Sequence, residues 1–358
     1  MHFPEESPRC SRRHGHHMIR PTTVILSTCA GLLVLTACAD QAPTQPDASV
    51  SSTALSNTWT ARAPLPGANP RIGLIAASVS NSAGQSIVYV FGGYECPCGD
   101  VPDQASSILA YNVSTNTWGT KRAQFIRSYS NGAGVISGKI YVPGGYDFSA
   151  GDGFCCTSFR STLWMYDPAA DRMVRKADMP RHTAEGVSGV IGGKLYVVAG
   201  DCDDCPTAEP RRLDRYNPAT NTWTVLAPPP HGHAAGTGGV INGKLYVAGG
   251  RFGPYLDVYD PATNRWTTLK SLPFAAFRAR SAVLNGKLYI VGLADPDRRT
   301  FAYNPATNAW NAKARFPFTQ NYPFAAVAVQ PGGSPRELTV GGVKNDGSAN
   351  APSQLYTP

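Results

Sequence analysis

The sequence predicts an all-β fold, a six-bladed β-propeller with four antiparallel strands per blade and a ring closed by the N-terminal strand. Three observations predict it. A motif of the form Tyr-Asn-Pro-Ala-Thr-Asn-x-Trp recurs along the chain, a glycine pair recurs in phase with it, and 36 Gly and 30 Pro in 358 residues make the chain turn-rich. Periods near 50 residues with strand-like content are typical of propellers, and a turn-rich chain favours many short strands over long helices.

The two repeats recur in phase. The aromatic motif opens on Tyr and closes on Trp in all copies but one: Tyr111–Trp118, Tyr166–Met173, Tyr216–Trp223, Tyr259–Trp266 and Tyr303–Trp310. An apolar stretch ending in a glycine pair, or in a variant of one, occurs six times: Gly92–Gly93, Gly144–Gly145, Ala199–Gly200, Gly249–Gly250, Gly292–Leu293 and Gly341–Gly342. The closing residues of these pairs are 52, 55, 50, 43 and 49 positions apart, so the chain holds six phased units.

Within one unit the strands can be placed in order. We expect them at Gly238–Ile241, Lys244–Val247, Leu256–Tyr259 and Trp266–Leu269. The dipeptide Asn242-Gly243 favours a primed hairpin turn between the first two strands. Asn264 suits the turn between the last two, because Asn adopts positive φ readily. Four such strands make one blade, whose Tyr and Trp fill the wedge against the next blade while the glycines allow close approach.

The two ends of the repeat region complement each other. Ser56–Trp59 reads as the back half of a repeat without a front half, and Gln354–Pro358 reads as a front half without a back half. Together they make one unit. The N-terminal strand is therefore predicted to complete the last blade.

The glycine pair, Tyr and Trp in this order resemble the kelch motif, and the resemblance covers about residues 55 to 358. Departures from it are few: Met173 in place of Trp, and Ala199 and Leu293 in place of Gly. The resemblance implies a binding platform or, in fewer members, an enzyme. Among the enzymes, the secreted six-bladed N-acetylneuraminate epimerases are the nearest analogue in blade count and export, and their substrate is an anionic sugar.

Residues 1–37 are predicted to be a signal peptide. Thr22–Leu35 is apolar, follows Arg20 and is too short for a stable membrane-spanning helix, and small residues before Cys38 suit a peptidase site. Leu35 to Cys38 (LTAC) resembles a bacterial lipobox, in which the Cys carries the lipid. An ordinary secretory signal is the alternative. Met18 begins a more typical signal peptide than Met1 does, so either residue is a candidate start.

Residues 38–54 are rich in Pro, Ser, Thr and Ala, which predicts a flexible tether between the lipid and a propeller at 55–358. The expected location is extracytoplasmic, anchored by lipid to the bacterial cell envelope in the periplasm or at the cell surface. The net charge is +8, but the basic residues are scattered with no Lys/Arg stripe among aromatics. We therefore expect no nucleic-acid partner, and contact with the membrane through the anchor only.

Six cysteines are expected between the second and third strands of the first three blades: Cys96, Cys98, Cys155, Cys156, Cys202 and Cys205. A C-x-x-C pair can bind zinc or act in redox chemistry. An even number of Cys in an exported domain instead favours disulfides, in one of about fifteen pairings. We expect no cofactor and no metal, because the pair His231 and His233 supplies too few ligands for a closed site.

Functional residues are expected at the mouth of the central channel, where the loops that enter the first strands and leave the second strands share one face. The polar candidates there are Arg71, Arg127, His182, His231, His233, Arg278, Arg280 and Tyr322. Glu185 is the only carboxylate on the expected inner strands, so it must be solvated or paired with a cation. It forms a salt bridge with one of the arginines, or it is a general acid/base with Arg127 or Arg280 holding an anionic ligand.

These observations leave three functions open. The first is an exported, lipid-anchored module that binds a protein or a carbohydrate at the channel mouth. The second is a sugar-active enzyme of the mutarotase or epimerase type acting on an anionic sugar, with Glu185, Arg127 and Arg280 as its catalytic candidates. The third is a purely structural envelope protein.

Overall fold

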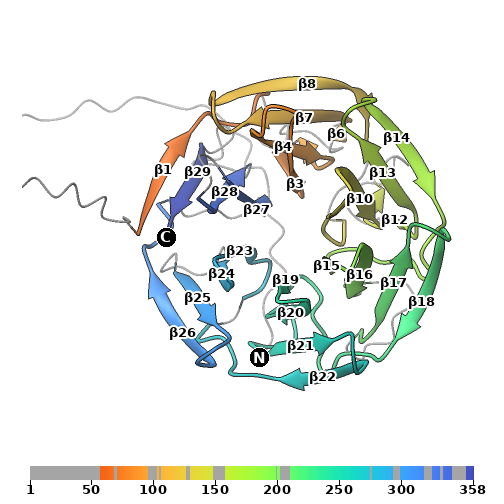
Figure 1. The fold of residues 1–358 in the computed structure, drawn as a ribbon, viewed down its shortest axis with the longest axis vertical. Coiled ribbons are helices and arrows are strands. Elements are labelled where there is room, and N and C mark those ends of the chain that lie inside the picture. Colours follow the sequence, from red (N-terminus) through yellow and green to blue (C-terminus); the bar gives the residue numbers. More distant parts are fainter. Residues whose placement is uncertain are drawn as a thin grey trace, which may run out of the picture. The chain divides into compact units, whose positions relative to one another are not determined.

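The computed structural model describes residues 57–67, 71–95, 103–104, 106–125, 130–147, 158–198, 200–201, 210–274, 276–292, 299–317, 325–330, 334–340 and 352–358. In this part of the chain all regular secondary structure is β-strand. Figure 1 shows the strands arranged as blades around a central axis. The described residues contain no helix that is long and apolar enough to cross a membrane.

Six four-stranded antiparallel sheets form the blades, which confirms the predicted number and type. From the axis outward, the strands of blades 1 to 3 are β3 (Ile75–Ser80), β4 (Ser86–Phe91), β7 (Ser107–Asn112) and β8 (Thr117–Gln124); β9 (Gly134–Ile136), β10 (Lys139–Pro143), β13 (Leu163–Asp167) and β14 (Arg172–Lys176); and β15 (Val187–Ile191), β16 (Lys194–Val198), β17 (Leu213–Asn217) and β18 (Thr222–Leu226).

Blades 4 to 6 repeat the pattern. Their strands are β19 (Thr237–Ile241), β20 (Lys244–Ala248), β21 (Leu256–Asp260) and β22 (Arg265–Thr268); β23 (Arg280–Leu284), β24 (Lys287–Val291), β25 (Thr300–Asn304) and β26 (Ala309–Lys313); and β27 (Ala325–Val329), β28 (Arg336–Val340), β29 (Ser353–Thr357) and β1 (Thr58–Arg62). The short strands β2 (Arg71–Ile72), β5 (Tyr94–Glu95) and β6 (Asp103–Gln104) form one further sheet, and β11 (Tyr146–Asp147) pairs with β12 (Ser158–Phe159).

The strands expected for the fourth unit lie within one residue of the observed bounds. Asn242 and Gly243 both have positive φ, 50° and 73°, as a primed two-residue turn requires. Asn264 also has positive φ, 52°. The backbone therefore adopts the turn conformations that the sequence predicts at these positions.

The ring closes through its N-terminal strand, as predicted. Strand β1 pairs antiparallel with β29 from Thr58 opposite Thr357 to Arg62 opposite Ser353. Residues almost 300 positions apart thereby belong to one sheet, and the edge of blade 6 is covered.

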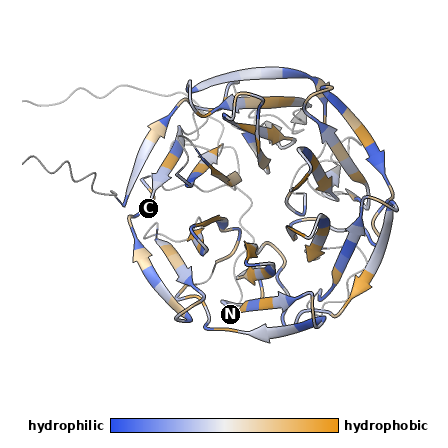
Figure 2. Ribbon diagram, viewed as in Figure 1, coloured by the Kyte–Doolittle hydropathy of each residue, from blue (hydrophilic) through white to orange (hydrophobic). Residues whose placement is uncertain are grey.

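The second strand of each blade is the most buried and the outermost strand is the most exposed. In Figure 2 the inner strands are mostly orange and the outermost ones mostly pale or blue, with the end of β18 as an orange exception. The six tyrosines that open the aromatic motif are fully buried: Tyr111, Tyr166, Tyr216, Tyr259, Tyr303 and Tyr356. The apolar core therefore lies in the seams between blades, where the repeated Tyr and Trp meet the neighbouring sheet.

The aromatic motif also latches each blade to the one before it. In blade 4 the Tyr259 hydroxyl donates to Asn264 Oδ1 at 2.8 Å, and the same oxygen accepts the backbone N–H of Ala227 at 3.1 Å. The indole of Trp266 donates to the carbonyl of Ala227 at 2.8 Å. Asn and Trp together thus grip one residue of blade 3.

The same latch recurs around the ring, with the gripped residues Ala63, Ala177, Lys270 and Ala314. In blade 2 Asp171 takes the place of Asn and accepts the N–H of Arg122 at 2.9 Å, while Met173 stands where the other blades have Trp. The sequence predicted these aromatics as packing residues. The structure adds that they make polar contacts between blades.

Candidate ligand-binding site

The inner strands of all six blades enclose a cavity of about 330 Å³ on the propeller axis. Its walls come from β3, β9, β15, β19, β23 and β27 and from the residues just before these strands. Most lining residues are Gly, Ala, Ser, Thr or Val, so the axis is left open. Three lining residues are charged: Glu185, Arg278 and Arg280.

Glu185 and Arg278 form an ion pair in the wall of this cavity. Glu185 Oε1 accepts a hydrogen bond from Arg278 Nη2 at 2.7 Å. The Glu185 side chain is 3% exposed and that of Arg278 is 35% exposed. The second carboxylate oxygen, Oε2, is buried and has no hydrogen-bond partner among the described residues. The pair therefore has one satisfied oxygen and one unsatisfied oxygen beside an open cavity.

Both residues of the pair have left-handed backbone conformations. Glu185, Ala235 and Arg278 precede the inner strands of blades 3, 4 and 5 by two residues, and their φ angles are 56°, 57° and 51°. The other non-glycine residues with positive φ in the described part of the chain are Asn, Asp or Ser. For Glu, Ala and Arg, a left-handed backbone conformation costs about 1 kcal/mol per residue.

Backbone hydrogen bonds support this strained arc. The N–H of Ala235 donates to the carbonyl of Glu185 at 2.8 Å, and the N–H of Arg278 donates to the carbonyl of Ala235 at 2.8 Å. The arc thus passes from blade 3 through blade 4 to blade 5. It aims the side chains of Glu185 and Arg278 at each other across the intervening blade, and strain of this kind concentrates at functional sites.

Burial raises the pKa of Glu185 above its usual value. The guanidinium of Arg278 opposes that rise, Asp201 adds to it, and Arg251 opposes it. A raised pKa makes a carboxyl a better proton acceptor when it is ionised, and keeps it protonated to a higher pH than usual. Burial, followed by the charge of Glu185, also raises the pKa of Tyr146, so its hydroxyl remains protonated.

A second ion pair lies nearer the surface. Arg251 Nη2 donates to Asp201 Oδ2 at 2.7 Å, with side-chain exposures of 48% and 21%. The ring of Phe277 lies 5.7 Å from the Arg251 guanidinium carbon and 5.2 Å from that of Arg278. Phe277 therefore joins the outer pair to the pair in the cavity wall.

Arg280 also lines the cavity. Its Nη1 donates to the backbone carbonyls of Arg278 and Ala279 at 3.2 and 3.0 Å. These bonds fix the guanidinium next to Arg278. Two cationic groups and one acid thus share one wall, which suits a ligand that carries both a carboxylate and hydroxyl groups.

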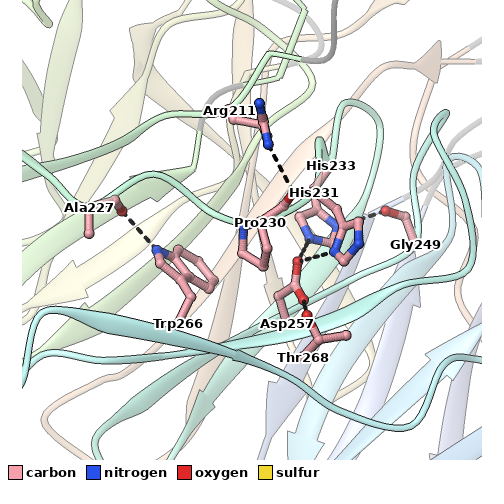
Figure 3. A network of polar contacts seen from close by, with 9 residues as sticks. All are labelled: Arg211, Ala227, Pro230, His231, His233, Gly249, Asp257, Trp266 and Thr268. Atoms are coloured by element: carbon pink, nitrogen blue, oxygen red, sulfur yellow. Dashed lines mark hydrogen bonds and ion pairs between the residues drawn. The ribbon is translucent and has the colours of Figure 1, made fainter.

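The two predicted rim histidines instead converge on one buried carboxylate, Asp257 of β21 (Figure 3). Its Oδ2 lies 3.0 Å from His231 Nδ1 and 3.0 Å from His233 Nε2, and its Oδ1 accepts from the Thr268 hydroxyl at 2.7 Å. Burial tends to raise the pKa of Asp257, but the hydrogen bonds from His233, Thr268 and His231 outweigh it and the pKa is lowered. Neither histidine lines the cavity.

The structure places the other predicted residues as follows. Arg71 is 2% exposed and donates from Nη2 to the carbonyl of Ser107 at 2.9 Å, and it does not line the cavity. His182 is exposed just before Glu185. The predicted site, lipidation and disulfide residues that lie outside the described residues are Arg127, Tyr322, Cys38, Cys96, Cys98, Cys155, Cys156, Cys202 and Cys205.

Sequence reasoning missed Asp257, Tyr146 and Arg251 as parts of this region. Asp257 lies on a third strand, and no local pattern marks it as the partner of two histidines. Arg251 directly follows a glycine pair, and Tyr146 does so in blade 2, so position after that pair is a signal that could have found both. Within the described residues, no group of three His, Cys, Asp or Glu side chains is arranged to hold a metal ion.

Comparison with known proteins agrees with this architecture. The kelch motif family model matches residues 183–230 and 234–273. Kelch-like protein 38 of Rattus norvegicus is 30% identical over 113 residues, which are 32% of this chain and 17% of the relative. The Homo sapiens protein of that name is 26% identical over 144 residues, 40% of this chain and 21% of the relative. The chain therefore spans only a minor part of the curated relatives it matches.

A solved structure titled "Structure of YjhT" is similar over most of both chains. Its TM-score is 0.61 at 16% sequence identity, and the match covers 82% of this chain and 95% of that one. At this identity the similarity concerns the fold alone.

Proposed function

This chain is a kelch-repeat β-propeller, and we propose that it is a binding module whose axial cavity takes a small carboxylate-bearing ligand of the acidic-sugar class. The observation that carries the proposal is the Glu185–Arg278 pair, with its unsatisfied Oε2 and with Arg280 on the same cavity wall. A guanidinium recognises a carboxylate through paired N–H donors, and a buried carboxylate oxygen accepts a hydroxyl.

The rest of the cavity supports a ligand with several hydroxyl groups. Ser188, Thr237 and Ser281 are among its lining residues, and Thr237 Oγ1 lies 2.6 Å from Ser281 Oγ. Ser281 Oγ also contacts the carbonyl of Gly238 at 2.8 Å. Such hydroxyls can donate or accept, so they adapt to a sugar. A volume of about 330 Å³ lies at the small end of the range for small-molecule sites.

Calorimetry with N-acetylneuraminic acid as the probe tests the proposal. Its methyl ester is the matched control, because the ester has the same hydroxyls but no charge. We expect the acid to bind and the ester to bind at least about tenfold more weakly, equivalent to the loss of a charge-assisted hydrogen bond. Arg280→Ala should weaken the acid, whereas Lys244→Ala, which breaks the Lys244–Asp260 pair on β20 and β21, should not. Equal affinity for acid and ester would remove the proposed role of the arginines.

A second candidate function is a sugar mutarotase, and the raised pKa of Glu185 favours it. In such a reaction the carboxylate of Glu185 would take the proton of the anomeric hydroxyl, and the protonated Glu185 would then give that proton to the ring oxygen. The ring bond then breaks to give the open-chain carbonyl form, and it closes again on either face with the protons restored. Polarimetry on freshly dissolved N-acetylneuraminic acid tests this. Faster anomer exchange that is lost in Glu185→Gln supports the enzyme, and binding without faster exchange supports the module.

We further propose that the propeller is exported and held to the cell envelope by a lipid on Cys38, since LTAC precedes a Pro/Ser/Thr-rich tether. Cells expressing the full chain with an alkyne-labelled fatty acid should yield labelled protein. Cys38→Ala should abolish the label, while Cys29→Ala, within the apolar run, should retain it. Label that survives Cys38→Ala would contradict the proposal.

A further inference from the structure

The segment 231–236 carries the backbone link between Glu185 and Arg278. It precedes β19 and contains Ala235, whose N–H and C=O bond Glu185 and Arg278 respectively. The N–H of Arg251 donates to the carbonyl of Ala234 at 2.8 Å, so the outer ion pair is attached to the same segment. The position of segment 231–236 therefore influences both ion pairs.

His233 anchors this segment from within. Its side chain is fully buried, its Nδ1 lies 2.9 Å from the carbonyl oxygen of Gly249, and its Nε2 lies 3.0 Å from Asp257 Oδ2 (Figure 3). A carbonyl and a carboxylate can only accept hydrogen bonds. Both ring nitrogens must then carry a proton for both bonds to form. The lowered pKa of Asp257 is consistent with the shared proton residing on the imidazole.

Blade 3 has no histidine at the position that corresponds to His233. Asp214 of β17 matches Asp257 of β21 in strand register, and it is bonded by Arg212 Nε at 2.7 Å. Thr183 stands where His233 does, two residues before the left-handed residue that precedes the inner strand. An arginine keeps its charge at all relevant pH values, whereas a histidine does not. Blade 4 thus places histidines on the aspartate where blade 3 places an arginine.

We infer that His233 is a positioning residue: its doubly protonated ring holds segment 231–236 in the conformation that joins Glu185 to Arg278, and loss of its proton loosens that link. This inference goes beyond the proposed function and depends on it only for its effect on ligand binding.

The direction of the effect follows from the hydrogen bonds. When the ring loses one proton, a nitrogen lone pair faces either the Gly249 carbonyl or the Asp257 carboxylate, and that bond becomes repulsive. The groups around His233 are Asp257 from β21, His231 from its own segment and the Gly249 carbonyl after β20. Thr268 of β22 contacts the far oxygen of Asp257. None of these can replace the lost donor at high pH.

Two measurements without a ligand test the inference on the whole propeller. In ¹⁵N-histidine NMR, His233 should show two protonated nitrogens at pH 7. Hydrogen exchange of the Ala235 and Arg278 amides, corrected for the intrinsic pH dependence of exchange, should accelerate about fivefold as His233 loses its proton, the equivalent of one hydrogen bond. His233→Gln should show the faster exchange already at pH 7 and no further step.

His182→Gln is the matched control, because His182 is exposed and belongs to the entrance of blade 3. It should keep the wild-type profile. A singly protonated His233 at pH 7 would overturn the inference, and so would unchanged Ala235 and Arg278 exchange in His233→Gln. Measured next, the affinity for N-acetylneuraminic acid should fall over the same pH range. If this probe does not bind at all, the proposed function loses support while NMR and exchange still decide the inference.

Discussion

Glu185 Oε1 and Arg278 Nη2 lie 2.7 Å apart although they belong to blades 3 and 5 and are 93 positions apart in the chain. Blade 4 separates the two blades around the ring, and its Ala235 bonds to both residues through the backbone. The contact is possible because the three inner strands converge on the axis, where blades that are not adjacent come within side-chain reach. The ion-paired part of the cavity wall is therefore built by blades 3, 4 and 5 together.

Arg278→Ala should destabilise the propeller by about 1–2 kcal/mol, less than for a fully buried pair because Arg278 is 35% exposed. The loss should grow as pH rises. The pKa of Glu185 in the folded protein is already raised by burial, and Arg278 opposes that rise. The pKa of Glu185 should therefore be raised further in Arg278→Ala. Stability tied to a raised carboxyl pKa is complete below the unfolded value and is lost as pH rises through the folded pKa. Urea unfolding between pH 4 and 8 measures this, and Glu185→Gln/Arg278→Ala should restore a flatter profile. Equal pH dependence in wild type and Arg278→Ala would contradict the coupling.

Glu337 occupies a position where the other blades bury an aliphatic side chain. By strand register it corresponds to Val88, Ile140, Leu195, Leu245 and Leu288. All five are 0% exposed, and so is Glu337. Neither oxygen of Glu337 has a hydrogen-bond partner among the described residues, and burial raises its pKa well above the usual value. Burial in the folded propeller therefore favours the neutral form of Glu337.

Glu337→Leu should stabilise the protein by about 2 kcal/mol at pH 7, since it removes a buried polar group that lacks partners. The gain should be smallest at low pH, where Glu337 is protonated in both states and only an unpaired neutral carboxyl is removed, and it should increase as pH rises above the unfolded pKa. Thermal unfolding at several pH values measures it. Glu337→Gln is the control: it should flatten the pH dependence without the full gain. A loss of stability at pH 7 in Glu337→Leu would show that the carboxyl has a partner.

Trp59→Phe should weaken ring closure. Trp59 on β1 donates to the Ala314 carbonyl at 3.2 Å and packs on Tyr356 and Phe316 at centroid distances of 4.9 Å, and the Phe ring keeps the packing but loses the bond. The expected cost is about 1 kcal/mol. Trp310→Phe breaks the equivalent latch, to Lys270, inside the ring and is the matched control. Amide exchange in β29 should accelerate in Trp59→Phe only. Equal acceleration in both variants would mean that the closing strand is no weaker than the rest.

The six cysteines of the propeller should carry no free thiol in protein prepared from an oxidising compartment: Cys96, Cys98, Cys155, Cys156, Cys202 and Cys205. Thiol titration of the denatured, unreduced protein measures this, and the reduced sample, in which all six react, is its control. Six reactive thiols before reduction would reject the disulfides. Partial reaction would identify which pair remains open once the labelled peptides are assigned.

The sequence alone was enough for the ring, because the signals that build a blade are local. Asn242-Gly243 favours its own hairpin turn, and Tyr259 donates a hydrogen bond to Asn264 only five residues away. The half-repeats that contain Trp59 and Tyr356 have complementary sequences, and they pair in the structure. Each of these depends on backbone preferences and on a repeated spacing, both of which can be read directly from the order of residues. The number of blades, the strand order and the closure follow from them.

The tertiary structure decided what the polar residues do. The sequence offered Glu185 several arginines, but only the convergence of blades 3, 4 and 5 pairs it with Arg278, and only the fold turns His233 inward onto Asp257. In the sequence, Glu337 is an ordinary polar residue near the start of a strand, and only the folded ring shows that it is fully buried. The physical reason is the distance along the chain over which each signal acts. Repeat spacing is local and sets which strand a residue joins. The partner of a charged side chain, in contrast, comes from a distant part of the chain and meets it only across the axis or between blades.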